Sequence, residues 1–383
     1  MSSLQPFTVH VSDEELDDLK RRIIQTRWPD EIMNSGWKFG ANLSYMKELS
    51  EYWYSKFDWR KVEDEINAYP NFIANIDGHH VHFIHIKGGG DQCPALIITH
   101  GWPGSFLELK KLIPLLTTGD DLCFDLVIPS MIGYGFSEKP EAEGANVFLM
   151  ADLWVKLMIM LGYEKFLAQG GDFGAGITTV MAWKYPQHLI GIHLNYIPGS
   201  YRPYLDSKEN LTEEELRSEK DTDEWHAREG AYIHQHRTKP QTLSYGLNDS
   251  PVGLAAWLIE KFYGWAACKG DIENCFTKDE LLANITLYWF SQTIHSSIRL
   301  YYENSRVPLH FQKDEFIWVP VGIARFPLEE PFPPRSLIER SYNVQHWTEM
   351  AEGGHFAAME QPALLANDIR LFAKKITSAK SSQ

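Results

Sequence analysis

The feature that most constrains the fold is a regular alternation of short apolar segments with helical patterns, which begins near residue 94. Short, almost wholly apolar runs are typical of strands that are buried on both faces of a parallel sheet. Strands that alternate with helices place those helices on both faces of such a sheet. We therefore predict an α/β fold with a mostly parallel sheet, with strands at 95–99, 124–128, 166–168 and 189–194 and helices near 105–116, 147–162 and 174–185.

The alternation stops at about residue 200 and resumes after residue 306. The stretch between these points is rich in Tyr and Trp and has a helical pattern, whereas a strand at 316–321 and an amphipathic helix at 362–374 follow it. The simplest topology is a helical lid inserted into the α/β core. We expect four divisions: an N-terminal arm and first hairpin at 1–90, the first part of the core at 91–199, the lid (cap) at 200–306 and the second part of the core at 307–383.

The N-terminal arm is expected to be helical. Ser12 and Glu15 have the spacing of a capping box, and a helical apolar repeat continues from there until Pro29. A second helix carries Met46, Leu49 and Trp53 on one face. Apolar segments on both sides of Asp77-Gly78 then predict a β-hairpin.

Length and charge exclude several classes of protein. The chain has 383 residues and a net charge of −15, and its acidic and basic residues are interspersed. Nucleic acid is therefore not an expected partner, because binding to a phosphate backbone requires clustered cations. No segment reaches the roughly 18 apolar residues of a membrane span, and no signal peptide precedes the arm. We expect a soluble, cytoplasmic protein without a membrane anchor.

Cysteine and histidine give weaker signals. The four cysteines, Cys93, Cys123, Cys268 and Cys275, contain no C-x-x-C pair and are too sparse for a disulfide framework, so we expect reduced thiols. Four histidines cluster at positions 79, 80, 82 and 85. Since no carboxylate or thiol companion is evident, we expect no metal site there.

A strand-to-helix turn is the strongest candidate for a catalytic site. Gly170-Gly171-Asp172-Phe173-Gly174 lies between a predicted strand and a predicted helix. Glycines flank Asp172 at a distance of two residues on either side. This spacing suits a sharp elbow that exposes its central side chain. A bare G-x-D-x-G is otherwise often a simple turn.

Two further loops follow predicted strands and complete a recognisable arrangement. His100-Gly101-Trp102-Pro103-Gly104-Ser105 could supply an oxyanion hole, in which the backbone N–H groups of Trp102 and Phe173 are the donors, although its pattern also fits a plain tight loop. His355 follows Gly353-Gly354 beyond the last predicted strand. The order nucleophile, acid, histidine is that of an α/β-hydrolase triad.

An aspartate at the elbow restricts the chemistry. A carboxylate with a pKa near 3.9 is already ionised at pH 7 and attacks without help from a base. His355 would therefore act in a second step, in which it activates a water molecule to hydrolyse an alkyl-enzyme ester. The suitable electrophiles are chiefly epoxides and haloalkanes.

At this point the sequence resembles the microsomal-type epoxide hydrolases, a branch of the α/β-hydrolases that includes juvenile hormone epoxide hydrolases. The resemblance extends from about Pro6 to Lys374. It is carried by the arm from Pro6 to Pro29, the loop at 100–105, the elbow at 170–174, the stretch at 247–254 and Gly353-Gly354-His355-Phe356.

The resemblance implies roles for individual residues. It makes Asp172 the nucleophile, His355 the base that activates water, and Glu329 the acid of the triad, with the adjacent Glu330 as an open alternative. Two lid tyrosines would donate hydrogen bonds to the epoxide oxygen, namely Tyr232 and Tyr301, with Tyr302 as the alternative to Tyr301. The implied reaction needs a small-molecule epoxide and water but no metal or organic cofactor. A homodimer is left open.

Two other functions remain to be weighed. A haloalkane dehalogenase also uses an elbow aspartate and a histidine, but halide leaves without an acid, so the tyrosine pair distinguishes the two enzymes. A non-catalytic protein that binds a hydrophobic ligand on a hydrolase scaffold is the second alternative. We expect Tyr232 and Tyr301 to face Asp172 across a cavity, and most other lid aromatic residues to be packing, among them Trp225, Trp257, Phe262, Tyr263, Trp265, Tyr288 and Trp289.

Overall fold

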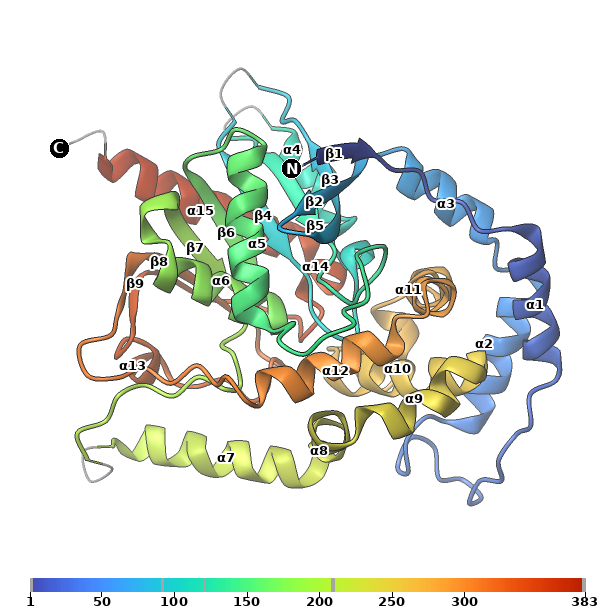
Figure 1. The fold of residues 1–383 in the computed structure, drawn as a ribbon. Coiled ribbons are helices and arrows are strands. Elements are labelled where there is room, and N and C mark those ends of the chain that lie inside the picture. Colours follow the sequence, from blue (N-terminus) through green and yellow to red (C-terminus); the bar gives the residue numbers. More distant parts are fainter. Residues whose placement is uncertain (1–2, 91–92, 120–121, 208–210, 381–383) are drawn as a thin grey trace.

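The computed structural model describes residues 3–90, 93–119, 122–207 and 211–380 (Figure 1). Within them, nine strands form one sheet in the order β1-β2-β3-β5-β4-β6-β7-β8-β9. The six strands from β5 to β9 in this order are parallel to one another, whereas β1 pairs antiparallel with β2, β2 with β3 and β3 with β5. The strands are β1 (Ser3–Pro6), β2 (Asn71–Ile76), β3 (His79–Ile86), β4 (Ala95–Thr99), β5 (Asp125–Pro129), β6 (Phe166–Gly170), β7 (Leu189–Leu194), β8 (Ile317–Arg325) and β9 (Tyr342–Glu349).

The central strands are apolar throughout because both of their faces are buried. Ile97 of β4 packs into one hydrophobic cluster, whereas its neighbours Leu96 and Ile98 pack into the other. This alternation follows from the two-residue period of a strand. Helices α5 (Val147–Met160) and α6 (Asp172–Lys184) cover one face of the sheet, and α4 (Leu112–Thr117) and α15 (Pro362–Lys380) cover the other (Figure 1).

Register places the ends of two central strands side by side. Thr99 of β4 pairs with Gly170 of β6, and both strands end at these residues. The loop that starts at His100 and the turn that starts at Gly171 therefore leave the same edge of the sheet. In parallel sheets this carboxyl-terminal edge is where ligands bind.

Helices fill the interval between β7 and β8. Figure 1 shows them below the sheet, from α7 in yellow-green to α12 in orange. In the described residues these are α7 (Glu213–Glu229), α8 (Ala231–Thr238), α9 (Pro240–Asp249), α10 (Pro251–Trp265), α11 (Lys278–Ser291) and α12 (Ile294–Asn304). The expected α/β fold with inserted helices is confirmed.

The N-terminal arm packs against these lid helices. Its helices are α1 (Asp13–Ile24), α2 (Leu43–Ser55) and α3 (Trp59–Asn67), and they contact α10 and α11. The Trp37 ring stacks on Tyr263 with centroids 3.9 Å apart, and the Arg22 guanidinium donates to the Asp249 carbonyl at 2.9 Å. The arm therefore packs on the outer side of the lid helices and helps to hold them in place.

Most sequence-based boundaries agree with the structure within a few residues, but some do not. The capping box at Ser12 and Glu15 is present, yet α1 ends at Ile24, five residues before Pro29. The helix expected over 105–116 is divided into the 3₁₀ turn η1 (Phe106–Leu109) and α4. Strand β1 and helix α3 were not predicted. Strand β1 has only four residues, whereas Trp59, Val62 and Ile66 of α3 are buried at helical spacing, so the sequence does carry a signal for this helix.

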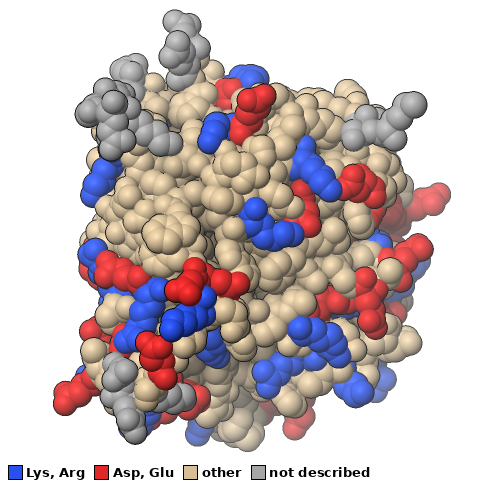
Figure 2. All heavy atoms as spheres, turned by 60° about the vertical axis from the view of Figure 1, so that its left-hand side comes forward, with Lys and Arg blue, Asp and Glu red and all other residues tan. Residues whose placement is uncertain are grey.

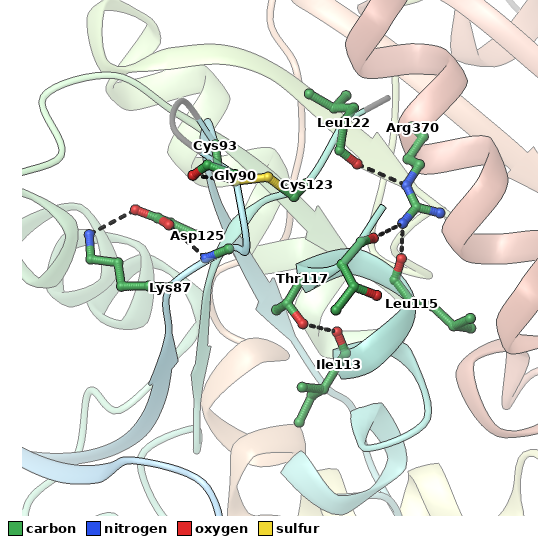
Figure 3. The surroundings of a disulfide bond; sticks show 12 residues. Lys87, Gly90, Cys93, Ile113, Leu115, Thr117, Leu122, Cys123, Asp125 and Arg370 are labelled. Carbon is green, nitrogen blue, oxygen red and sulfur yellow. Dashed lines mark hydrogen bonds and ion pairs between the residues drawn. A yellow bond between two sulfur atoms is a disulfide. The ribbon is translucent and has the colours of Figure 1, made fainter. Parts of the chain in front are cut away.

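The expectation that all cysteines are reduced is wrong for one pair. Cys93 and Cys123 form a disulfide with their Cα atoms 5.2 Å apart (Figure 3). Each precedes one of two adjacent parallel strands, β4 and β5, so both lie at the same edge of the sheet. Nearby, the Arg370 guanidinium of α15 donates to the carbonyls of Leu115 and Leu122. Cys268 and Cys275 are free.

The histidines on and near the hairpin are bonded to protein groups. His79 contacts the Glu138 carboxylate, and the buried His82 ring bonds to Ser130 and Asn71. His85 bonds to the Tyr163 hydroxyl at 3.0 Å. Three of these four partners are neutral oxygen groups on other elements, so the histidine cluster joins β3 to its neighbours.

The surface agrees with the charge analysis. Figure 2 shows a face on which Lys and Arg are interspersed with Asp and Glu rather than gathered in one basic area. None of the helices in the described part of the chain is both long and apolar enough to cross a membrane.

Candidate active site

Asp172 is the first residue of α6, at the sharp turn that follows β6, and its backbone φ is +45°. Such values are rare for residues other than glycine. A Cβ atom on Gly170 would lie 2.3 Å from the Gly174 backbone, and one on Gly174 would lie 2.0 Å from the Thr99 carbonyl oxygen. Both glycines are therefore required for α6 to approach β4 and β6 closely enough to form this elbow.

Two backbone N–H groups bind the Asp172 carboxylate. The Trp102 N–H donates to its Oδ1 at 2.8 Å, and the Phe173 N–H also bonds to it. Burial raises the pKa of Asp172 above its ordinary value, whereas His355 and these two N–H groups oppose the shift. The pair of donors expected from the sequence thus converges on one carboxylate.

The loop that carries Trp102 is held in place by the lid. Asn284 of α11 donates its side-chain amide to the Pro103 carbonyl at 2.8 Å. One turn later in the same helix, the Tyr288 hydroxyl donates to the Gly104 carbonyl at 2.8 Å. The Trp102 side chain is completely buried. Its N–H is therefore oriented by contacts with both the core and the lid.

His355 lies between two carboxylates. Its Nε2 is 3.7 Å from Asp172 Oδ2, and its Nδ1 is 3.0 Å from Glu329 Oε1. Burial lowers the pKa of His355, but the carboxylates, led by Glu329, raise it more, and the pKa stands at about 9. The two carboxylates therefore favour the protonated form of the imidazole.

The choice between the two adjacent glutamates is decided by burial and contact. Glu329 follows β8, is 4% exposed and bonds to His355, whereas Glu330 is exposed. Burial raises the pKa of Glu329, and His355 opposes the rise. Glu329 is thus the carboxylate against the histidine.

Tyr232 of α8 and Tyr301 of α12 come together over Trp102. The Tyr232 ring stacks on Trp102 with centroids 5.5 Å apart, and the Tyr301 ring meets Trp102 edge-on at 5.7 Å. The two tyrosines are linked by a side-chain hydrogen bond, and burial raises the pKa of both phenols well above its ordinary value. Tyr302 does not line this site and instead packs under the Arg306 guanidinium.

A cavity of about 440 Å³ lies between the core and the lid. Asp172, His355, Tyr232 and Tyr301 all line it. Among the lid aromatic residues named from the sequence, Trp225 and Trp265 also line it, whereas Trp257, Phe262, Tyr263, Tyr288 and Trp289 do not. The structure therefore brings the two expected tyrosines to the same cavity as Asp172 and places most other lid aromatics in packing.

Three residues near the site were not anticipated from the sequence. Tyr196 lines the cavity with its ring 6.1 Å from that of His355. Glu360 accepts the N–H groups of Gly354 and Phe356, at 3.0 and 2.9 Å, and so holds the loop that carries His355. Glu108 lies beneath Asp172. No motif marks these positions, because their roles arise from contacts between distant segments.

Two family models match this chain. Residues 4–109 match the family model for the epoxide hydrolase N terminus, and residues 94–228 match the model for the α/β hydrolase fold. Epoxide hydrolase 1 of Sus scrofa is 40% identical over 401 residues, which cover 97% of this chain and 88% of that protein.

Two solved structures share nearly the whole fold. The juvenile hormone epoxide hydrolase from the silkworm Bombyx mori matches with a TM-score of 0.86 and 29% identity, over 99% of this chain and 96% of that one. Aspergillus niger epoxide hydrolase matches with a TM-score of 0.86 and 30% identity, over 98% and 97% of the two chains. With a shared fold and 40% identity to a relative over almost its full length, this chain belongs to the epoxide hydrolase family of the α/β-hydrolases.

Proposed function

We propose that this protein hydrolyses a lipophilic epoxide to a vicinal diol through a covalent ester on Asp172. The observation that carries the proposal is that the Asp172 carboxylate, bound by two N–H groups, shares one cavity with the hydroxyls of Tyr232 and Tyr301. The core supplies the carboxylate and the inserted helices supply the phenols. Because the inserted helices complete a site whose carboxylate comes from the core, this arrangement supports the assignment of residues 200–306 as a lid.

In the first step, an Asp172 carboxylate oxygen attacks one carbon of the epoxide ring. The bond between that carbon and the ring oxygen breaks, and the oxygen develops alkoxide character. Tyr232 and Tyr301 donate hydrogen bonds to this oxygen, and one of them transfers its proton. Their raised pKa values keep both phenols protonated before the reaction. The resulting tyrosinate regains a proton from solvent.

In the second step, His355 removes a proton from a water molecule that attacks Cγ of the Asp172 ester. The N–H groups of Trp102 and Phe173 stabilise the oxyanion of the tetrahedral intermediate. When the intermediate collapses, the diol oxygen leaves with the proton held by His355. The oxygen from water stays in the Asp172 carboxyl group, which releases its remaining proton and becomes a carboxylate again. Glu329 orients the imidazole and stabilises its charge.

Ester formation also prepares the histidine for this second step. The charge of Asp172 is one of the causes that raise the pKa of His355 to about 9. Because the ester is neutral, its formation removes this cause, and the pKa of His355 falls. The imidazole then loses its proton to solvent more readily than in the free enzyme, and the neutral ring acts as the base.

The same geometry favours epoxides over haloalkanes. A halide ion leaves a saturated carbon without taking up a proton, so a dehalogenase has no use for two buried phenols beside the carboxylate. A purely binding role is disfavoured by the contacts of His355 with both Asp172 and Glu329, since a hydrophobic ligand would need neither carboxylate. The aromatic walls formed by Trp225 and Trp265 suit a lipophilic substrate.

The test is to trap the ester. The His355→Gln variant is mixed with styrene oxide, digested and examined by mass spectrometry. We expect an adduct on the peptide that contains Asp172, because the ester forms but its hydrolysis is blocked. His79→Gln, a change on the distant hairpin, serves as the matched control and should accumulate no adduct. Diol production by His355→Gln at the wild-type rate, without an adduct, would refute the proposal.

A further inference from the structure

A second, much smaller cavity lies against the same two catalytic side chains. It has a volume of about 30 Å³, and Asp172 and His355 line both this cavity and the large one. The other polar groups that line it include Glu108, Gln169 and Asn195. A water molecule needs roughly 10–15 Å³ of such volume and two to four polar partners, so this cavity can hold one or two waters.

Glu108 is the charged group in this cavity that the proposed mechanism does not use. It lies in the 3₁₀ turn η1, and its Oε1 accepts the Gly101 N–H at 3.3 Å. A Cβ atom on Gly104 would lie 1.9 Å from Glu108 Oε2, so the absence of a side chain at Gly104 leaves room for this carboxyl group. The loop that presents Trp102 is thus shaped around Glu108.

The charges around Glu108 are those of the catalytic groups. Its main charged neighbours are His355 and Asp172, and the Tyr288 phenol is also close. Lys111, which lies on the far side of Glu108, is paired with Glu280. Burial raises the pKa of Glu108 to about 8, His355 opposes the rise, and the Asp172 charge adds to it. One long hydrogen bond from Gly101 does not account for a carboxyl group that shares a small cavity with Asp172 and His355.

We propose that the small cavity holds the water molecule that hydrolyses the Asp172 ester, and that Glu108 binds this water and orients it beside His355. The inference rests on the proposed function and adds a catalytic residue to it. In this arrangement one O–H of the water points to His355 Nε2 and the other to Glu108, which directs the oxygen lone pair at Cγ of Asp172. The water approaches from the small cavity, while the diol portion of the ester occupies the large one.

The protons in this step balance. For this step Glu108 gives up its proton to solvent. Loss of the Asp172 charge in the ester favours this ionisation, whereas burial and the loss of the His355 charge oppose it. As a carboxylate it accepts a hydrogen bond from the water. His355 takes one water proton and gives it to the departing diol oxygen. The second proton remains on the oxygen that enters Asp172 and passes to Glu108 when the Asp172 carboxylate forms again.

The decisive variant is Glu108→Gln. Glutamine has the same shape and can still accept the Gly101 N–H, but it cannot become a carboxylate. In single-turnover experiments with styrene oxide, stopped-flow tryptophan fluorescence and quenched mass spectrometry measure ester formation and ester hydrolysis separately. We expect ester formation to stay within about 3-fold of wild type and hydrolysis to slow by about 10- to 100-fold, so that the ester accumulates.

A matched control and a conservative variant separate this role from a structural one. Glu63 is also a buried glutamate that accepts a backbone N–H, from Val11, but it lies in α3, away from both cavities. Glu63→Gln should change neither step. Glu108→Asp retains the charge and should recover part of the hydrolysis rate.

The outcomes distinguish this inference from the proposed function. Hydrolysis at the wild-type rate in Glu108→Gln would overturn the role of Glu108, as would equal slowing of both steps, which would indicate a distorted loop. If neither wild type nor His355→Gln ever carries an ester on Asp172, the proposed function itself fails. An ester in His355→Gln together with fast hydrolysis in Glu108→Gln would contradict only the proposed role of Glu108 and would leave the proposed function intact.

Discussion

The close approach of α6 to β4 predicts a large effect from one added methyl group. In Gly174→Ala the new Cβ atom would lie 2.0 Å from the Thr99 carbonyl oxygen and 3.0 Å from the His100 carbonyl oxygen. Real Cβ contacts essentially never fall below 3.0 Å, so the helix and the strand would have to separate by about 1.0 Å. Both obstructing atoms belong to backbone, which cannot rotate away as a side chain can.

That displacement acts on the hydrogen bond between the Trp102 N–H and Asp172. A shift of this size along the bond would lengthen it from 2.8 Å to about 3.8 Å, beyond hydrogen-bonding range. We expect kcat/KM to fall about 100-fold, since misplacement by about 1 Å typically costs that much. Overpacking should also lower the free energy of unfolding by about 1–3 kcal/mol.

The assay compares this variant with a change in the same helix. In Gly176→Ala the new Cβ atom meets only side-chain atoms, of which Val147 Cγ1 at 3.3 Å is the nearest. We expect Gly176→Ala to retain activity within about 3-fold, and its helix propensity to offset part of the contact. Styrene oxide turnover and urea unfolding are measured for both variants. Wild-type kcat/KM in Gly174→Ala would refute the argument that the glycine is needed for the elbow.

Two more predictions test the lid and the disulfide. Tyr232→Phe combined with Tyr301→Phe should lower epoxide turnover by more than about 10³-fold because no phenol remains to protonate the ring oxygen, whereas Tyr302→Phe in the same helix should leave turnover unchanged; full activity in the double variant would place the acid elsewhere. Replacing both Cys93 and Cys123 by Ser should lower the free energy of unfolding by about 3–4 kcal/mol, as expected for a closed loop of this length. The measurement is a urea titration without reductant, and Cys275→Ser is the control. An unchanged urea midpoint would contradict it.

Local patterns were sufficient for the parts of this protein that depend on local geometry. The elbow could be recognised because Gly170 and Gly174 are spaced as a tight strand-to-helix turn requires, and the structure shows both in close backbone contact. The strands at 95–99 and 189–194 could be placed because both faces of a central strand are buried and its sequence is therefore apolar throughout. The fold class follows from the order of such segments along the chain.

Other features depend on which segments meet in space. Glu329 and Glu330 are equivalent in the sequence, and only the path of the chain after β8 turns the first toward His355 and leaves the second exposed. Cys93 and Cys123 carry no pairing signal, yet the parallel pairing of β4 with β5 brings them together.

The sequence by itself thus determined the α/β fold, the elbow aspartate and the set of residues from which a hydrolase site could be built. Only the tertiary structure decided which aromatic residues line the cavity, which glutamate contacts His355, and that Glu108 lies beneath Asp172. The physical reason is that periodicity and glycine spacing report the local path of the backbone. The burial, pKa and contacts of a side chain depend instead on segments that are remote in the chain.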